Sequence, residues 1–586
     1  MSGNDQTSES RLRYQADDGI PLPLALGLGL QLTALIVAIP ILIPTAVMRA
    51  AGASEAQLTW VVFATVAICG IATVLQACRI GRIGAGHVIV MSSSAAFIGL
   101  AIDAIDRGGA ALLVTLVVVA SLFQFLLSAR LALFRRILTP TVSGTVLMLV
   151  PVTAMQVIFA MLDQAPEGSP AHVAPLTAIA TVLAIVLIAL KSGGVLRLWA
   201  PVIGVAAGSA VGGFFGLYDF ERVAGASWLG LPSMQWPGID LDFGSAFWSL
   251  LPAFLLVTLI VTLRSISSCV AVQSVSWRRK RAVDFRAVQG TVNVDGIGNL
   301  LSGLAGTIPS TGYSISAALA ELTGVAARGV GIATGAIFVL LALFPKALAG
   351  VLAIPGPVVG GYLGVLMAML FLVGIRVLLQ QGLDYRKGLV ACIAFWIGLG
   401  FEMELIFPEQ AAAFAGGLFS NAMTTGGLAA VLMTLFLELT ESRRSRMDVA
   451  LEGSALPRIR EFLRAFAARE GWSDGMVHRL EAVAEEALLS LVEEEDGKKR
   501  APRRRLRLVA RRDRAGAVLE FAAAPREDNI QDRLAVLGDP DDDVFTGRDV
   551  SLRMLRHLAS SVHHQQYHDV DIVTVHVRAP ARASHG

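Results

Sequence analysis

The residues of this sequence that could do chemistry are one arginine and a set of serines inside long apolar stretches. Arg264 lies in the apolar run 246–274, and the runs GHVIVMSSSAAF from Gly86 and GTIPSTGYSISAAL from Gly306 are rich in Gly, Ser, Thr and Pro. An arginine inside a membrane is costly unless it is paired or hydrated. A helix broken at mid-membrane leaves backbone N–H and C=O groups that need partners. Together these features predict a polar solute site, and the guanidinium favours an anion.

The composition places these residues in a membrane. The chain has 586 residues, of which 54% are hydrophobic and 16% charged, whereas soluble proteins have about 25% charged residues. Residues 441–586 hold 25 Lys/Arg and 25 Asp/Glu, so charge is concentrated at the C-terminal end. We expect a polytopic helical membrane domain followed by a soluble domain. The net charge of +2 argues against a nucleic acid as partner.

Fourteen apolar segments are predicted to cross the membrane, since a spanning helix needs about 20 apolar residues. Lys and Arg concentrate in alternate loops, which the positive-inside rule assigns to the cytoplasm. We therefore expect a multi-pass protein of the inner (cytoplasmic) membrane of a bacterium, with both termini in the cytoplasm. The segments lie near 22–49, 57–77, 86–104, 109–134, 138–161, 173–190, 197–216, 246–274, 290–304, 312–325, 327–353, 357–380, 386–405 and 411–439.

The segments divide into two halves of seven, 22–216 and 246–440, and an odd number per half requires that the halves be inverted. The sequence PTVSG at 140–144 is echoed by PVVGG at 357–361, and the serine-rich third segment is echoed by the tenth. Short segments interrupted by Gly, Pro or Ser at matching places point to the solute site of a secondary transporter. The alternative, that small residues only let helices pack closely, fits two matched segments poorly.

These segments resemble the nucleobase–ascorbate transporter family, also called nucleobase:cation symporter-2, which includes uracil and xanthine permeases. The strongest stretches are 294–328 and 343–378, with shorter ones at 28–32, 92–99 and 138–150. The resemblance implies a core domain (helices 1–4 and 8–11), a gate domain (helices 5–7 and 12–14) and an elevator-like motion between them. It also implies a solute bound between the third and tenth segments, a homodimer and no enzymatic activity.

The site departs from the family pattern. Arg264 stands where the family has Glu, Ile315 replaces a second Glu, and Ser268 stands where some bacterial members have His. Ala95 aligns with an aromatic residue that stacks on the base, and Leu32 replaces another His. The substrate-binding positions that the resemblance implies are Ser94, Ala95, Phe97, Arg264, Ser265, Ser268, Tyr313, Ser314, Ile315 and Ser316.

The solute chemistry must change with these residues. Two carboxylates could accept hydrogen bonds from the ring N–H groups of uracil or xanthine, whereas Arg accepts none and stays charged. We take Glu321, near a predicted helix end, as the acidic residue of the eighth to eleventh segments. The expected partner of Arg264 is therefore a small anionic solute or an anionic heterocycle, such as a carboxylate, an oxyanion or a urate-like molecule. The sulfate-permease family resembles this layout in placing a basic residue near an anion site.

Three alternatives stay open. Arg264 could lie toward the cytoplasmic end of its helix and extend to water. The protein could be a xanthine, uracil or urate cation symporter with a rebuilt site. It could also be a solute sensor that signals through its C-terminal domain. The residues do not decide between H⁺ coupling, Na⁺ coupling and uniport.

The C-terminal domain is predicted to be an α/β fold. It resembles the histidine-kinase-like ATPase fold in its anti-sigma-factor serine-kinase version, at 484–494 and 547–565. Ser490 stands where that family has its Mg-binding Asn, and 522–530 lacks the glycine-rich motif that reads adenine. We therefore expect no cofactor, no metal site and no ATP binding. A regulatory role is expected instead, with an anti-sigma-antagonist-like protein as a candidate partner.

The predicted organisation has four parts, and the last contains alternating helices and strands. The parts are an N-terminal cytoplasmic tail at 1–21, the transporter domain at 22–440, a linker at 441–455 and the cytoplasmic domain at 456–580. In the cytoplasmic domain, helices are predicted at 459–470, 474–495 and 549–562, and strands at 505–512, 517–524 and 572–579.

Overall fold

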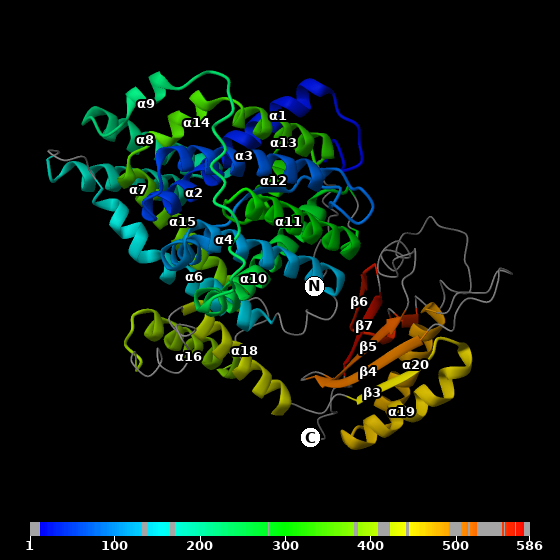
Figure 1. Ribbon diagram of the computed structural model, residues 1–586. Coiled ribbons are helices and arrows are strands. Elements are labelled where there is room, and N and C mark those ends of the chain that lie inside the picture. The colour runs from blue at the N-terminus through cyan, green and yellow to red at the C-terminus, as the bar shows by residue number, and fades with distance from the viewer. Residues whose placement is uncertain are drawn as a thin grey trace. The chain divides into compact units, whose positions relative to one another are not determined.

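A computed structural model describes most of the chain as two compact units (Figure 1). The first unit comprises Met1–Arg279 and Ala287–Leu437, and the second comprises Lys280–Arg286 and Glu438–Gly586. The described residues are 12–131, 139–164, 170–278, 281–379, 385–407, 422–440, 445–491, 505–513, 516–523, 554–555, 557–568 and 570–578.

The first unit consists of helices and two short strands. Its described residues include six helices long and apolar enough to cross a membrane, or seven if α13 and α14, which meet at 84°, form one broken span. The predicted multi-pass helical domain is confirmed at this level, while the count of fourteen and the inverted repeat stay predictions. The elements are α1 (Leu22–Ile36), α2 (Ala38–Ala50), α3 (Glu55–Ala77), β1 (Val90–Ser93), η1 (Ala95–Phe97), α4 (Ile98–Ala129), α6 (Pro140–Leu162), α7 (Val173–Lys191), α8 (Gly194–Phe214), α9 (Phe220–Gly225), α10 (Ser245–Val275), α11 (Phe285–Leu304), β2 (Ser310–Tyr313), α12 (Ile315–Thr323), α13 (Arg328–Ala342), α14 (Pro345–Leu352), α15 (Gly356–Leu379), α16 (Tyr385–Glu402) and α18 (Ala422–Thr440).

Local chemistry explains where several helices begin and bend. α3 begins with a capping box, in which the Ser54 hydroxyl accepts from the Gln57 N–H and the Gln57 side chain accepts from the Ser54 N–H, so that two free helix-end donors are satisfied. α4 bends at Gly109, whose φ of 74° is non-helical and suits glycine. This bend lies at the predicted boundary between the third and fourth segments.

The helices of the first unit pack in two sets. α13 packs on α1 and on α3, and α4 packs on α10. In the other set α15 packs on α6, α7 and α8, and α16 packs on α6. Figure 1 shows α13 beside α1 and α3, which lie far from it in the sequence. The first set consists of helices that the resemblance assigns to a core domain, and the second of helices that it assigns to a gate domain; this division stays a prediction.

The backbones of α3 and α13 approach each other closely at a pair of glycines. A Cβ atom on Gly335 would lie 2.5 Å from the Gly70 carbonyl oxygen, and one on Gly70 would lie 2.7 Å from the Gly335 carbonyl oxygen. Small residues permit such helix contacts in membranes, where packing replaces the hydrophobic effect between helices. Both positions therefore require glycine.

We predict that Gly335→Val prevents α3 and α13 from packing. Two methyl groups would have to enter space held by backbone atoms, and overpacking of this kind costs about 1–3 kcal/mol or more. The measurement is the yield of monodisperse protein in detergent and its thermal midpoint. Gly27→Val on α1 is the control, because a Cβ there has nothing within 4 Å; equal yields for both variants would contradict the prediction.

The second unit contains a five-stranded antiparallel sheet in the order β3-β4-β5-β7-β6. Helices α19 and α20 pack on one face through a fully buried core that includes Ile459, Leu463, Leu508 and Phe521. The helix pair is joined by ion pairs from Arg460 to Glu485 and from Arg464 to Glu481, both 2.6 Å. The elements are β3 (Ser445–Ala450), η2 (Gly453–Ala455), α19 (Leu456–Arg469), α20 (Asp474–Leu491), β4 (Arg505–Asp513), β5 (Gly516–Ala523), β6 (Ser561–Gln566) and β7 (Asp571–Arg578).

The C-terminal sheet differs from the sequence prediction at two strands. β3 lies in the range predicted as a linker, 441–455, and pairs along its whole length with β4. β6 begins at Ser561, where the predicted helix 549–562 was expected to end. Most of that helix and residues 524–530 of the range 522–530, where the adenine-reading motif was expected, lie outside the described residues.

Candidate functional site

The third and tenth segments cross as two short antiparallel strands. β1 pairs with β2 in a register that sets Val90 opposite Tyr313 and Ser93 opposite Ser310. β1 leads into η1 and α4, and β2 leads into α12. Both segments thus break their helical structure at one place, as their Gly, Ser, Thr and Pro content predicts.

α10 holds β2 in position through two serines. The Ser265 hydroxyl accepts from the Gly312 N–H at 3.0 Å and lies 3.0 Å from the Thr311 hydroxyl. The Ser268 hydroxyl donates to the Gly312 carbonyl at 3.1 Å. Both serines are buried, so the hydroxyls of these two residues, predicted to bind substrate, are already engaged with β2.

Ser265→Ala is expected to destabilise the protein by about 1–3 kcal/mol, because the buried Gly312 N–H would lose its acceptor. The measurement is the thermal midpoint of unfolding in detergent. Ser274→Ala on the same helix is the control, since its exposed hydroxyl donates only to the Ala271 carbonyl. The prediction fails if the two midpoints are equal.

Arg264 lies next to the strand crossing. Its guanidinium carbon is 4.3 Å from the centroid of the Tyr313 ring, a cation–π geometry, and the Tyr313 hydroxyl donates to the Ser93 carbonyl at 3.0 Å. Arg264 is half-buried. Among the residues that the structure describes, it makes no ion pair. Arg264 therefore places a positive charge beside the strand crossing, and its predicted pairing with an anion stays a prediction.

The start of α12 lies beside Tyr313. Ser314 precedes the helix and is exposed, and Ile315 is half-buried. The buried Ser316 hydroxyl donates to the Val88 carbonyl and so ties α12 to the segment before β1. Of the two serines at the start of α12, Ser314 is thus exposed and Ser316 is buried.

The third-segment residues are more buried than a stacking role requires. Ala95 is 3% exposed and Phe97 1% exposed, and the Phe97 ring packs on Phe254 at 5.8 Å. The hydroxyls of Ser92, Ser93 and Ser94 are buried without a hydrogen-bond partner among the described residues. At the crossing, the Phe97 ring is covered by Phe254, whereas these three serine hydroxyls lack hydrogen-bond partners among the described residues.

The prediction that Glu321 is the acidic residue of the eighth to eleventh segments is wrong, because Asp295 lies in α11. Asp295 is 0% exposed, and neither carboxylate oxygen has a hydrogen-bond partner among the described residues. The Ser265 hydroxyl lies beside it. Glu321 is exposed. An acidic residue within an apolar segment was the visible signal for Asp295.

A buried polar network continues from α11 to β2. Asn299, one helical turn after Asp295, accepts from the Ser310 N–H at 2.6 Å and donates to the Gln124 side chain at 2.9 Å. Gln124 in turn donates to the Thr262 hydroxyl at 3.1 Å. The network connects α4, α10, α11 and β2 and was not anticipated from the sequence.

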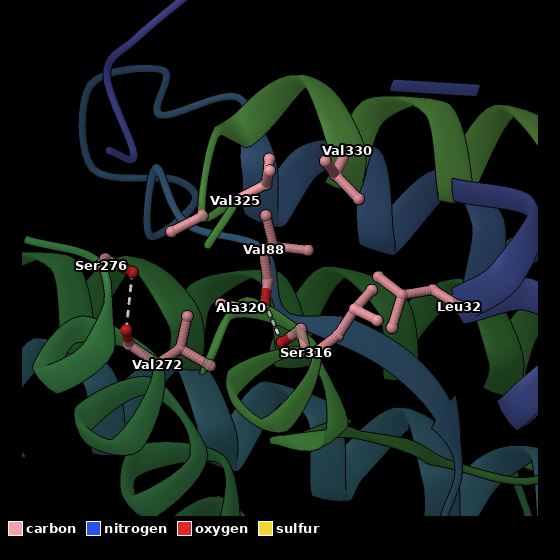
Figure 2. A pocket seen from close by; sticks show the side chains of 10 residues that line it. Leu32, Val88, Val272, Ser276, Ser316, Ala320, Val325 and Val330 are labelled. Atoms are coloured by element: carbon pink, nitrogen blue, oxygen red, sulfur yellow. Dashed lines mark hydrogen bonds between the residues drawn. The ribbon is translucent and has the colours of Figure 1, made fainter. Parts of the chain in front are cut away.

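A small cavity lies beside the crossing, between α1, α10, α12 and α13 (Figure 2). Leu32, Val88 and Val330 make it largely apolar, and the hydroxyls of Ser276 and Ser316 bond to backbone carbonyls (Figure 2). It has room for about one water molecule. Leu32, which stands where the related family has His, thus lines an apolar space too small for a nucleobase.

Helix α20 of the C-terminal domain carries Glu486 and Ser490 in the stretch 484–494 on which the predicted nucleotide-binding pattern rests. One carboxylate oxygen of Glu486 is buried without a hydrogen-bond partner among the described residues. Ser490 is buried one turn later and donates to the Ala487 carbonyl. Groups of three or more His, Cys, Asp or Glu side chains that could hold a metal are absent from the described part of the chain.

Comparison with solved structures finds membrane transporters. The transmembrane domain of the cyanobacterial bicarbonate transporter BicA gives a TM-score of 0.43 at 17% identity, covering 72% of this chain and all of that one. The murine anion transporter Slc26a9 in its inward-facing state gives 0.46 at 13% identity, covering 75% of this chain and 71% of that one.

Comparison with curated sequences finds permeases. Xanthine permease XanP of Escherichia coli is 27% identical over 451 residues, covering 73% of this chain and 95% of the relative. Uric acid permease PucK of Bacillus subtilis is 28% identical over 408 residues, covering 68% of this chain and 92% of the relative. The model of the xanthine/uracil permeases, described as "Permease family", matches residues 25–408. The chain therefore belongs to the xanthine/uracil permease family of multi-pass membrane transporters.

Proposed function

We propose that this protein is a secondary transporter whose altered site favours an anionic heterocycle, with urate as the model solute. The observation that carries the proposal is the guanidinium of Arg264, which stacks on Tyr313 beside the strand crossing and has no ion pair among the described residues. A planar guanidinium can donate two parallel hydrogen bonds to an anionic oxygen pair. The relatives named for xanthine and uric acid support a purine-like solute.

The solute in this proposal lies between Arg264 and the start of α12. The exposed Ser314 supplies a hydroxyl, and the first N–H groups of α12 favour negative charge. Ser265 and Ser268 act as positioning residues, because their hydroxyls already bond to Gly312. Neutral uracil would find an arginine and an isoleucine where related permeases have carboxylates, and we expect it to bind weakly.

Asp295 is the group we propose for cation coupling. A fully buried carboxyl group without a hydrogen-bond partner is costly as an anion unless a proton or a cation neutralises it. Its neighbour Ser265 also bonds to the backbone of β2. Binding of a proton or a cation at Asp295 and binding of the solute beside β2 would therefore both affect β2.

We further propose that the set containing α1, α3, α4, α10 and α13 moves as a core against the set containing α6, α7, α8, α15 and α16. This division is supported by the packing within each set. The C-terminal domain is proposed to regulate this motion rather than to hydrolyse ATP, because Ser490 replaces the Mg-binding Asn of the ATPase pattern.

The test is uptake of radiolabelled urate, xanthine and uracil by proteoliposomes, with and without a pH or Na⁺ gradient. We expect urate uptake to exceed uracil uptake and to increase under either the pH gradient or the Na⁺ gradient. Solute binding in detergent without uptake in liposomes would support the sensor alternative instead. Preference for uracil would contradict the altered site while leaving the transporter class intact.

A further inference from the structure

One face of the C-terminal sheet carries a cluster of arginines at its β3–β4 edge. Residues directly opposite in an antiparallel pair point to the same face, and β3 sets Arg446 opposite Val509 and Asp448 opposite Arg507. Arg505 and Arg511 share this face by alternation along β4, while Leu506, Leu508 and Ala510 of the same strand point into the core under α19 and α20. We call Arg446, Arg505, Arg507 and Arg511 the arginine cluster.

The arginine cluster exceeds the negative charge beside it. All four arginines are exposed. Asp448 accepts from Arg507 at 2.8 Å, and this bond lowers the pKa of the Asp448 carboxyl, which keeps it charged. Arg446 and Arg511 make no ion pair or hydrogen bond among the described residues. Glu520 of β5 lies opposite Val509 and so shares this face. Four arginines thus stand against two acidic residues, Asp448 and Glu520, and the face keeps a net positive charge at neutral pH.

Few residues of the chain separate this edge of the sheet from an apolar helix. α18, an apolar helix, ends at Thr440, and β3 begins at Ser445. An extended residue spans at most about 3.6 Å, so β3 begins within roughly 18 Å of the end of that helix. Anionic lipids give the cytoplasmic leaflet a negative surface potential that attracts basic residues near it.

We propose that the arginine cluster docks the C-terminal domain on anionic lipid headgroups of the cytoplasmic leaflet. Each arginine near such a surface contributes about 1 kcal/mol. Loss of two therefore lowers the docked-to-free ratio roughly 25-fold. Docking would hold β3 flat against the membrane and so restrict the end of α18, from which the domain continues. This role is independent of the identity of the solute.

The experiment uses the full-length protein in lipid nanodiscs of phosphatidylcholine, with or without phosphatidylglycerol. Cys78 and Cys392 are replaced by Ser, and a fluorophore is attached at Ala450→Cys, which shares the face of the cluster. Headgroup-attached nitroxide lipids report proximity by quenching. A second reporter at Ala465→Cys, exposed on α19 over the other sheet face, gives the baseline.

Quenching at position 450 is expected to require phosphatidylglycerol, to fall with added salt and to exceed quenching at position 465. Arg446→Gln with Arg511→Gln should remove most of it. The matched control, Arg458→Gln with Arg479→Gln on α19 and α20, should not. Equal quenching in the two lipid compositions, or equal effects of the two double variants, would overturn the proposal. A change in fluorescence at position 450 that requires an added protein, and does not depend on phosphatidylglycerol, would also overturn the proposal and indicate a protein partner.

Discussion

Urate uptake should fall roughly 10- to 150-fold when Arg264 is replaced by Gln. A hydrogen bond to a charged group contributes about 1.5–3 kcal/mol, and each 1.4 kcal/mol is about tenfold in an equilibrium constant. Gln keeps hydrogen-bonding capacity and much of the side-chain length but removes the charge. Initial rates of urate uptake by proteoliposomes measure the effect, with the protein amount normalised in each preparation.

Two further variants separate the role of Arg264 from a general loss of positive charge. Arg264→Lys keeps the charge but loses the planar fork and its stacking on Tyr313, and we expect intermediate uptake. Arg376→Gln removes an exposed arginine from α15 and should leave uptake unchanged. If Arg264→Gln transports urate as the wild type does, the guanidinium does not bind the solute and extends toward water.

The second large effect is expected at Asp295, where Asn should abolish gradient-driven accumulation of the solute. The amide has the shape of a neutral carboxyl group but cannot exchange a proton or balance a bound cation. Facilitated exchange of urate across the membrane should persist, because the solute is proposed to contact Arg264 and Ser314. Accumulation under an imposed gradient and counterflow exchange, measured in the same liposomes, distinguish these two activities.

A structural role for Asp295 would give a different pattern. Asp295→Asn removes a buried carboxyl group that has no hydrogen-bond partner among the described residues, so its thermal midpoint should not fall below that of the wild type. Asp106→Asn is the control, since Asp106 is exposed in α4. Accumulation that survives in Asp295→Asn would exclude this residue as the coupling group. A lowered midpoint with loss of both activities would indicate a structural role.

The positions of the chain breaks could be predicted from sequence because they depend on local chemistry. The serine-rich segments around Ser92 and Thr311 cannot continue as regular apolar helices, and the structure has strands there. The bend at Gly109, between the predicted third and fourth segments, also depends on local chemistry, since its positive φ suits glycine. The C-terminal helices and the strands β4, β5 and β7 also follow from hydrophobic periodicity.

The roles of individual side chains could not be predicted because they depend on packing between distant segments. Ser265 and Ser268 resemble solute ligands in the sequence, but their hydroxyls bond to a strand more than forty positions away. Phe97 packs on Phe254, which only the fold brings near. Asp295 could have been found, since an acidic residue in an apolar segment is a functional signal.

The most direct test of the proposed site is a structure of the full-length protein with urate bound, compared with one prepared with uracil. If the solute binds as proposed, density for urate lies within hydrogen-bond distance of the Arg264 guanidinium and next to Ser314, and no density appears there with uracil. Urate density away from Arg264, or uracil density at the same place that persists in Arg264→Gln, would contradict the proposed solute site.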